Sequence, residues 1–115
     1  MASGTVSHDR QVGTLSGKSG YTAYEYAVRK MGNAVHVKGY ISKASGGFGT
    51  SQVTIGDITN VPPPPQTTRF VCATGVHAYD ATTCAYGAVD TSGNILILTP
   101  TGTHATAVLN FWYPV

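Results

Sequence analysis

Gly32-Asn33 stands between two runs in which apolar and polar residues alternate, from Tyr24 to Ile41. Alternation with a period of two is typical of a β-strand that buries one face. Glycine at the first central position of a two-residue loop favours a type II′ turn, because glycine adopts positive φ without steric cost. This stretch therefore predicts a β-hairpin with its turn at Gly32 and Asn33.

The position of the turn fixes which residues of the hairpin lie opposite each other. The first face is mostly apolar and contains the pairs Tyr24–Ile41, Tyr26–Gly39, Val28–Val37 and Lys30–Val35. The second face is more polar and contains the pairs Glu25–Tyr40, Ala27–Lys38 and Arg29–His36. A shift of one residue would expose the apolar set to water, so the hydrophobic pattern specifies the register.

Further short strands follow the hairpin, separated by residues that favour turns. They are predicted at 53–58, 67–73, 84–90, 95–98 and 105–113. In the last strand, odd residues from Ala107 to Tyr113 share one face, and even residues from Thr106 to Trp112 share the other. Ile95–Leu98 is apolar on both faces, which predicts burial between two sheets or beneath a neighbouring subunit.

The connections between these strands complete the fold prediction. Pro62–Pro65 has no N–H donors and predicts a stiff crossing outside the sheet. Phe48 lies among glycines, either as a lid that folds back on the core or as a contact residue. No segment predicts a helix. Seven or eight short strands at this spacing indicate an all-β fold, an antiparallel β-sandwich that is jelly-roll-like.

The domain organisation follows from the length and from the N-terminal composition. Residues 1–20 are rich in Ser, Gly and Thr, which predicts a linker or edge segment with at most one short strand. Residues 1–4 also resemble the vector-derived start of a recombinant chain. Residues 21–115 suit one β-sandwich head domain. We expect no signal peptide, because the first residues lack a basic start and an apolar core.

The charge content and the lengths of the apolar runs disfavour nucleic acid and membranes as partners. Only 10% of the residues are charged, against roughly a quarter in ordinary soluble domains. No basic cluster is present, which disfavours nucleic acid. No apolar run approaches ~18 residues, which disfavours membrane insertion. Polar uncharged side chains or a partner subunit must then cover the surface.

The residues that carry enzyme chemistry are scattered along the chain. Four His and five acidic residues show no nucleophile motif, phosphate loop or dinucleotide fingerprint, so we expect no catalytic activity and no cofactor. Cys72, His77 and Cys84 do not have the spacing of a zinc site, so no metal site is expected. The two Cys are either small half-buried thiols or a disulfide.

The sequence offers instead the side chains of a sugar-binding surface. Aromatic rings stack on the C–H faces of sugars, and carboxylates, amides and imidazoles bind the hydroxyl groups. The densest stretch is His77, Tyr79 and Asp80, to which we add Trp112 and His104 as candidate ligand-binding residues. Alternatives remain open: Tyr79 as a packed loop anchor, and Trp112 as core or subunit-interface packing.

The segment Tyr26 to Gly39 reads Tyr-x-Val-Arg-Lys-x-Gly-Asn-x-Val-x-Val-x-Gly. This pattern resembles the start of the C-terminal head domain of phage tail and fibre proteins from phages of Gram-positive bacteria. The likeness continues through Ile55-Gly56, the prolines at 62–65, Gly93-Asn94-Ile95 and the terminal Phe111-Trp-Tyr-Pro-Val115. The four consecutive prolines depart from the single proline of the pattern.

The resemblance implies a jelly-roll head on a homotrimer at the tip of a virion tail or fibre, where it binds host cell-surface saccharide. A trimer would also account for the low charge and for Ile95–Leu98. Binding residues of such heads sit in variable loops, so the resemblance assigns none here. Two alternatives remain: a structural trimeric decoration or fibre head without a specific ligand, and a small carbohydrate-binding module or glycan-active enzyme.

Overall fold

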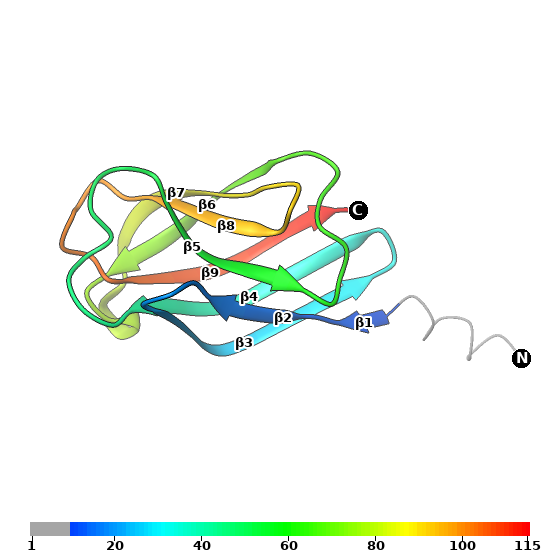
Figure 1. Cartoon of the computed structure of the whole chain (residues 1–115), viewed down its shortest axis with the longest axis horizontal. Helices are drawn as coiled ribbons and strands as arrows, with labels where there is room; N and C mark the ends of the chain where they lie inside the picture. The colour runs from blue at the N-terminus through cyan, green and yellow to red at the C-terminus, as the bar shows by residue number, and fades with distance from the viewer. Residues whose placement is uncertain (1–9) are drawn as a thin grey trace, which may run out of the picture.

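The computed structural model describes residues 10–115, which form nine β-strands and one short 3₁₀ turn (Figure 1). No α-helix occurs among these residues, which confirms the all-β prediction. The strands are β1 (Arg10–Val12), β2 (Thr14–Gly17), β3 (Tyr21–Met31), β4 (Ala34–Lys43), β5 (Val53–Thr59), β6 (Thr68–Gly75), β7 (Thr83–Val89), β8 (Asn94–Leu98) and β9 (Thr106–Pro114), and the turn is η1 (Ala78–Asp80).

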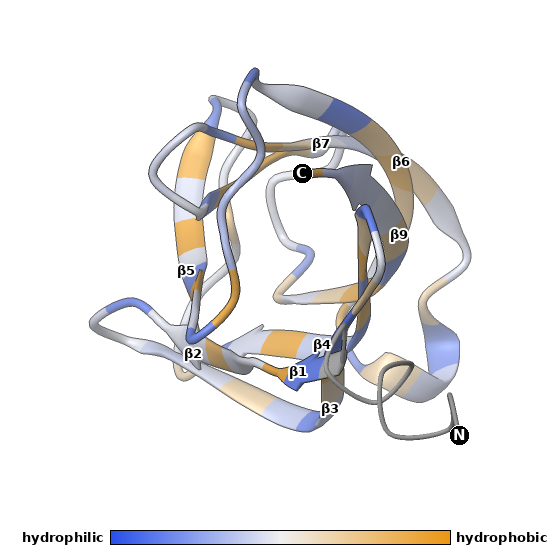
Figure 2. Cartoon of the chain, turned by 90° about the vertical axis from the view of Figure 1, so that its right-hand side faces the viewer, coloured by the Kyte–Doolittle hydropathy of each residue, from blue (hydrophilic) through white to orange (hydrophobic). Residues whose placement is uncertain are grey.

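All nine strands belong to one antiparallel sheet in the order β1-β3-β4-β9-β6-β7-β8-β5-β2. The sheet curls until its two edges approach each other, so the strands surround a central core (Figure 2). The antiparallel sandwich is confirmed, in the form of a nearly closed barrel. Sheets that curl in this way leave few unpaired edges exposed.

The two edges of the sheet are joined by the chain itself at Gly13. Val12 in β1 pairs with Arg29 of β3, and Thr14 in β2 pairs with Thr59 of β5. Between them, the Gly13 N–H donates to the Val28 carbonyl at 2.8 Å. Residues 10–17 therefore form two edge strands, and the prediction of at most one was wrong. The expected vector-derived start lies outside the described residues, as does the first part of the expected linker.

The β3–β4 hairpin has the predicted register near its turn only. Opposing pairs run as expected from Ala27–Lys38 to Lys30–Val35, and Gly32 has φ 62°. A β-bulge after Tyr24 then shifts the pairing by one residue, so that Tyr24 lies opposite Tyr40. The placement of Tyr24 and Tyr26 on the buried face was wrong, since both rings are exposed. An inserted residue reverses the alternation of faces beyond it, which a pure period-two pattern does not register.

The last two strands test the predicted faces. The odd residues of β9 from Ala107 to Tyr113 are all buried, as expected. In β8, Ile95 and Ile97 are buried, but Leu98 is exposed on the outer face. The expectation that both faces of this strand are buried was therefore wrong within the single chain. Burial beneath a neighbouring subunit stays a prediction.

The connections behave as the sequence indicates. Phe48 is buried and its ring stacks near Tyr21, with centroids 6.1 Å apart, so it closes the core as a lid. The proline segment lies outside the strands, between β5 and β6. The Tyr113 hydroxyl donates to the Pro62 carbonyl at 2.7 Å, which ties this crossing to β9 from inside the barrel.

We predict that Gly13→Ala destabilises the fold by about 1–3 kcal/mol, because overpacking a closed core forces side chains from their rotamers. A Cβ atom at Gly13 would lie 2.6 Å from Val28 Cγ1 and 3.1 Å from the Thr59 carbonyl oxygen. Urea unfolding followed by circular dichroism measures the change. Gly102→Ala is the control, since its nearest neighbour would be 3.5 Å away. Equal stability of the two variants would contradict the conclusion that the fold needs a residue without a side chain at position 13.

Candidate functional site

The residues 77–80 form a small rigid unit at the end of β6. The His77 N–H donates to Asp80 Oδ1 at 2.9 Å, and His77 Nδ1 lies 3.3 Å from Asp80 Oδ2. The imidazole stacks almost parallel on the Tyr79 ring, with centroids 4.9 Å apart. Three of the sequence-predicted site residues are thus held together by contacts with one another.

This unit needs a glycine beneath it. A Cβ atom at Gly75 would lie 2.8 Å from both the carbonyl oxygen and Oδ1 of Asp80, so only a bare backbone lets η1 fold this close to β6. The hydrogen bond from the His77 N–H lowers the pKa of the Asp80 carboxyl, against a smaller opposing effect of partial burial. Asp80 is therefore ionised near neutral pH and acts as the acceptor that orients His77.

Tyr79 is 84% exposed, so it is not a packed loop anchor. Its ring stands at the rim of an open groove of about 480 Å³. The groove runs between η1 and the neighbouring ends of β4 and β9, and Tyr40, Ser42, Lys43 and Thr106 contribute to its lining. Ligand pockets of proteins commonly measure about 300–1,000 Å³, so the groove is large enough for a small ligand.

The floor of the groove is a chain of polar contacts between three elements. Thr106 Oγ1 donates to the Val76 carbonyl at 3.2 Å and lies 2.8 Å from Ser42 Oγ. Lys43 Nζ donates to the Gly47 carbonyl at 2.9 Å, which holds the ammonium group beside the groove. The first two bonds join the end of β4 and the start of β9 to the segment that leads into η1. The lining can therefore offer hydroxyl, ammonium and aromatic groups in a defined arrangement.

The two other predicted site residues lie apart from this unit. His104 Nδ1 lies 2.9 Å from Thr74 Oγ1, which in turn contacts the buried Thr99 hydroxyl at 3.1 Å. His104 thus takes part in a polar network beneath the strand ends. Trp112 is near the opposite end of β9, 52% exposed, and stacks on His36 with centroids 4.5 Å apart. It does not belong to the core of this chain.

Sequence reasoning missed Tyr24, Tyr40 and Lys43 as neighbours of the candidate site. Tyr24 and Tyr40 stack with ring centroids 5.3 Å apart, and the Tyr40 hydroxyl donates to Glu25 Oε2 at 2.9 Å. This hydrogen bond is the main cause that raises the pKa of Tyr40. The sequence did place Tyr40 and Glu25 opposite each other on the polar face of the hairpin. Its connection to residues 77–80 depends on β9, which the sequence does not place beside β4.

The described residues contain no group of three or more His, Cys, Asp or Glu that could hold a metal ion. Cys72 and Cys84 are both free in the structure. Cys72 lies opposite Ala85, while Cys84 lies opposite Ala73, so the two thiols point to opposite faces of the β6–β7 pair. Cys72 is buried and Cys84 is exposed. Within residues 10–115, no helix is long and apolar enough to cross a membrane.

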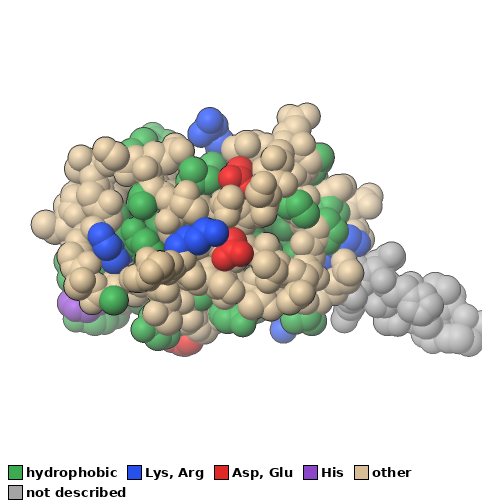
Figure 3. Space-filling view, in the orientation of Figure 1, with side chains coloured by type: hydrophobic (Ala, Val, Ile, Leu, Met, Phe, Trp, Pro, Cys, Tyr) green, Lys and Arg blue, Asp and Glu red, His purple; other side chains and the backbone are tan. Residues whose placement is uncertain are grey.

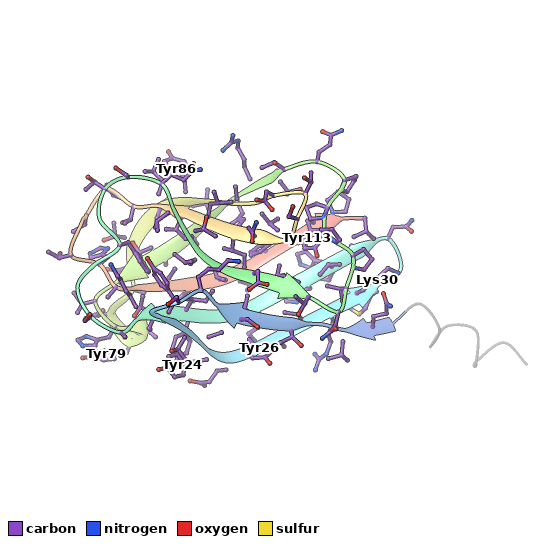
Figure 4. The ribbon with its side chains drawn as sticks, in the orientation of Figure 1. Tyr24, Tyr26, Lys30, Tyr79, Tyr86 and Tyr113 are labelled. Carbon is purple, nitrogen blue, oxygen red and sulfur yellow. The ribbon has the colours of Figure 1, made fainter. Side chains whose placement is uncertain are left out.

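Charged side chains are sparse on the face that Figure 3 presents, where Lys and Arg lie beside Asp and Glu. Figure 4 shows Tyr79, Tyr24 and Tyr26 along one margin of the molecule and Tyr86 on the opposite margin. Tyr79 of the candidate site and Tyr24 and Tyr26 of the hairpin therefore lie on the same margin in this view.

Comparison with known proteins gives a likeness in structure. No family model matches the sequence, and no curated protein matches it. Among solved structures, the receptor binding protein of Listeria phage PSA superposes with a TM-score of 0.66. The alignment covers 97% of this chain and 70% of that chain, with 20% sequence identity. The chain thus shares its fold with that structure.

We predict that only one of the two thiols reacts rapidly with an aromatic disulfide reagent at pH 8. Burial raises the pKa of the Cys72 thiol to about 12, so it stays protonated and shielded, and the thiolate is the reactive species. Cys84 is exposed and should react first. Denaturation should release the second thiol, and Cys84→Ser should abolish the rapid phase. Two equally fast thiols, or none, would contradict the structure.

Proposed function

We propose that this chain is a receptor-binding module of a phage particle, located at the tip of a tail or fibre. It binds a saccharide on the host cell surface without turning it over. The fold that it shares with a phage receptor binding protein supports the general role. The order of sequence motifs from Tyr26 to Val115, which resembles the head domains of phages of Gram-positive bacteria, supports the more specific one.

The observation that carries the saccharide proposal is the exposed Tyr79 ring, held by His77 at the rim of a groove. One face of an aromatic ring packs against the C–H groups of a sugar, while hydroxyl groups of the sugar need donors and acceptors around them. Ser42 and Lys43 supply such groups beside the ring, while the Thr106 hydroxyl is buried and already donates to the Val76 carbonyl. Asp80 holds the His77 imidazole, and the imidazole stacks on the Tyr79 ring. The Tyr79 ring is therefore preorganised, and little conformational entropy is lost when a ligand binds.

The test is binding of the purified chain to arrayed bacterial cell-wall polysaccharides, followed by calorimetry with the polysaccharide that binds. We expect Tyr79→Ala to weaken binding about tenfold or more, as for loss of a central aromatic contact. Tyr79→Phe is the matched control, since it keeps the ring, and should retain most of the affinity.

The outcomes separate this function from its alternatives. Absence of binding to every polysaccharide would contradict it and favour a structural decoration without a specific ligand. Release of reducing ends during incubation would favour a glycan-active enzyme. Equal affinity of the wild type and Tyr79→Ala would place the ligand elsewhere on the surface.

We also propose that the chain assembles into a homotrimer through the outer face of β6, β7 and β8. Val71 is 59% exposed and lies opposite Tyr86, which is 67% exposed and lies opposite Leu98. The three side chains thus form a contiguous apolar row across three strands. Exposed apolar patches of this kind mark protein interaction sites. None of these three side chains lines the candidate groove.

Light scattering of the purified chain should give three times the 12.0 kDa chain mass. The double variant Val71→Ser, Tyr86→Ser should dissociate into monomers and keep its β-type circular dichroism, because both side chains point outward. A wild-type monomer would contradict the trimer. A trimer that survives the double variant would contradict this choice of interface.

A further inference from the structure

We infer that the ligand is an internal segment of a polymeric glycan, bound along β4 and β9 from Tyr79 at one end to Trp112 at the other. This inference rests on the proposed function, since it assumes that the groove at Tyr79 binds saccharide. It adds the class of ligand and a second, separate part of the binding surface. We refer to this surface as the β4–β9 track.

The register of the two central strands creates the track. β4 and β9 pair without interruption, and the odd residues of β4 from Val35 to Ile41 face the core. The even residues of both strands therefore share the outer face. They form four adjacent pairs in one row: His36–Trp112, Lys38–Asn110, Tyr40–Val108 and Ser42–Thr106.

Three stacked aromatic pairs lie along this row. His77 and Tyr79 form the first, Tyr24 and Tyr40 the second, and His36 and Trp112 the third, with ring centroids 4.9, 5.3 and 4.5 Å apart respectively. Along a strand, the span from residue 36 to residue 42 measures about 20 Å at a rise of ~3.3 Å per residue. The His77–Tyr79 pair extends the row further, because its groove begins at Tyr40 and Ser42.

The part of the track between the aromatic pairs is hollowed, with polar side chains around a largely apolar lining. A second shallow groove of about 240 Å³ lies there, and its lining includes Glu25, Lys38, Tyr40 and Asn110. Tyr40 lines both this groove and the groove at Tyr79, so the two grooves are neighbours. Asn110 Oδ1 lies 2.7 Å from His36 Nε2, which orients the amide toward the third aromatic pair.

The β-bulge in β3 is a separate observation that points to the same surface. Glu25 has φ 47°, a conformation that costs a residue with a side chain of order 1 kcal/mol or more. The bulge places Tyr24 opposite Tyr40, exposed on the outer face, where regular alternation would bury it. It also presents Glu25 Oε2 to the Tyr40 hydroxyl. Residues with a strained backbone cluster at active sites and ligand clamps.

The mixed charge along the track favours a glycan over a nucleic acid as its ligand. Lys38 and Glu25 both border the middle groove, and the basic residues do not form a continuous row, so a nucleic acid backbone would find little neutralisation. Flat rings separated by amide, ammonium and hydroxyl groups suit successive sugar rings instead. A single sugar would occupy only one aromatic pair. A row longer than about 20 Å fits an extended chain.

The test uses the cell-wall polysaccharide that binds on the array, cleaved and fractionated by length from single repeat units to long chains. Affinity should rise with length until the track is filled. Trp112→Ala should weaken binding of long chains about five- to tenfold and leave binding of single units unchanged. Tyr79→Ala should weaken both. Trp112→Phe, which keeps a ring, is the matched control.

Trp112 is the only Trp of the chain and so reports directly on its end of the track. Its fluorescence should shift when long chains bind and stay constant when single units bind. Single units that bind as tightly as long chains, with Trp112 fluorescence unchanged by either, would overturn the track and leave the groove at Tyr79 intact. Absence of binding to every polysaccharide would overturn the proposed function and the track together.

Discussion

The unbroken antiparallel pairing of β4 with β9 determines most of this structure. It joins residues 34–42 to residues 106–114, and it buries one row of each strand while exposing the other. The buried row supplies the centre of the core, including Leu109 and Tyr113. The exposed row brings Tyr40 and Trp112 onto one outer face. A shift by one residue would exchange the two rows, so core and surface are specified by the same register.

The two ends of the sheet depend on a different constraint, which is the room available at Gly13. Any side chain there would press on Val28 and on the carbonyl of Thr59, so the chain passes from one sheet edge to the other only as bare backbone. The two edge strands that it joins are only three and four residues long, which limits the free hydrogen-bonding groups that invite aggregation. A closed, rigid scaffold is also what a binding surface requires, because its side chains are then held in place before the ligand arrives.

The candidate binding surface combines segments that are distant along the chain. The hairpin contributes Tyr24 and Tyr40, the turn after β6 contributes Tyr79, and the last strand contributes Trp112. The proposed trimer face uses another part of the same sheet, around Tyr86. Tyr86 lies on the margin opposite to Tyr79 (Figure 4), while Val71, at one end of the proposed trimer row, borders Val108 and Asn110 of β9.

Period-two patterns identified the strands well, because alternation reports directly on which side chains leave water. The turn at Gly32, the buried odd residues of β9 and the cluster at His77 to Asp80 all followed from local sequence. The bulge at Glu25 did not follow from local sequence. An inserted residue changes which face the residues beyond it occupy, but the order of apolar and polar residues in the sequence stays the same. The sequence did not predict that residues 10–17 form both edge strands. Their pairing partners are β3 and β5, and no local pattern shows which strands will pair.

The sequence by itself thus determined the all-β class, most strands and the hairpin turn, and it singled out His77, Tyr79 and Asp80 as candidate residues. These depend on the conformations of neighbouring residues and on local hydrophobic alternation. Only the tertiary structure decided that the sheet curls on itself, that Tyr24 faces outward and that the turn with Tyr79 lies beside the end of the β4–β9 pair remote from Trp112. Those features depend on long-range pairing and on the space between packed strands, which no local pattern contains.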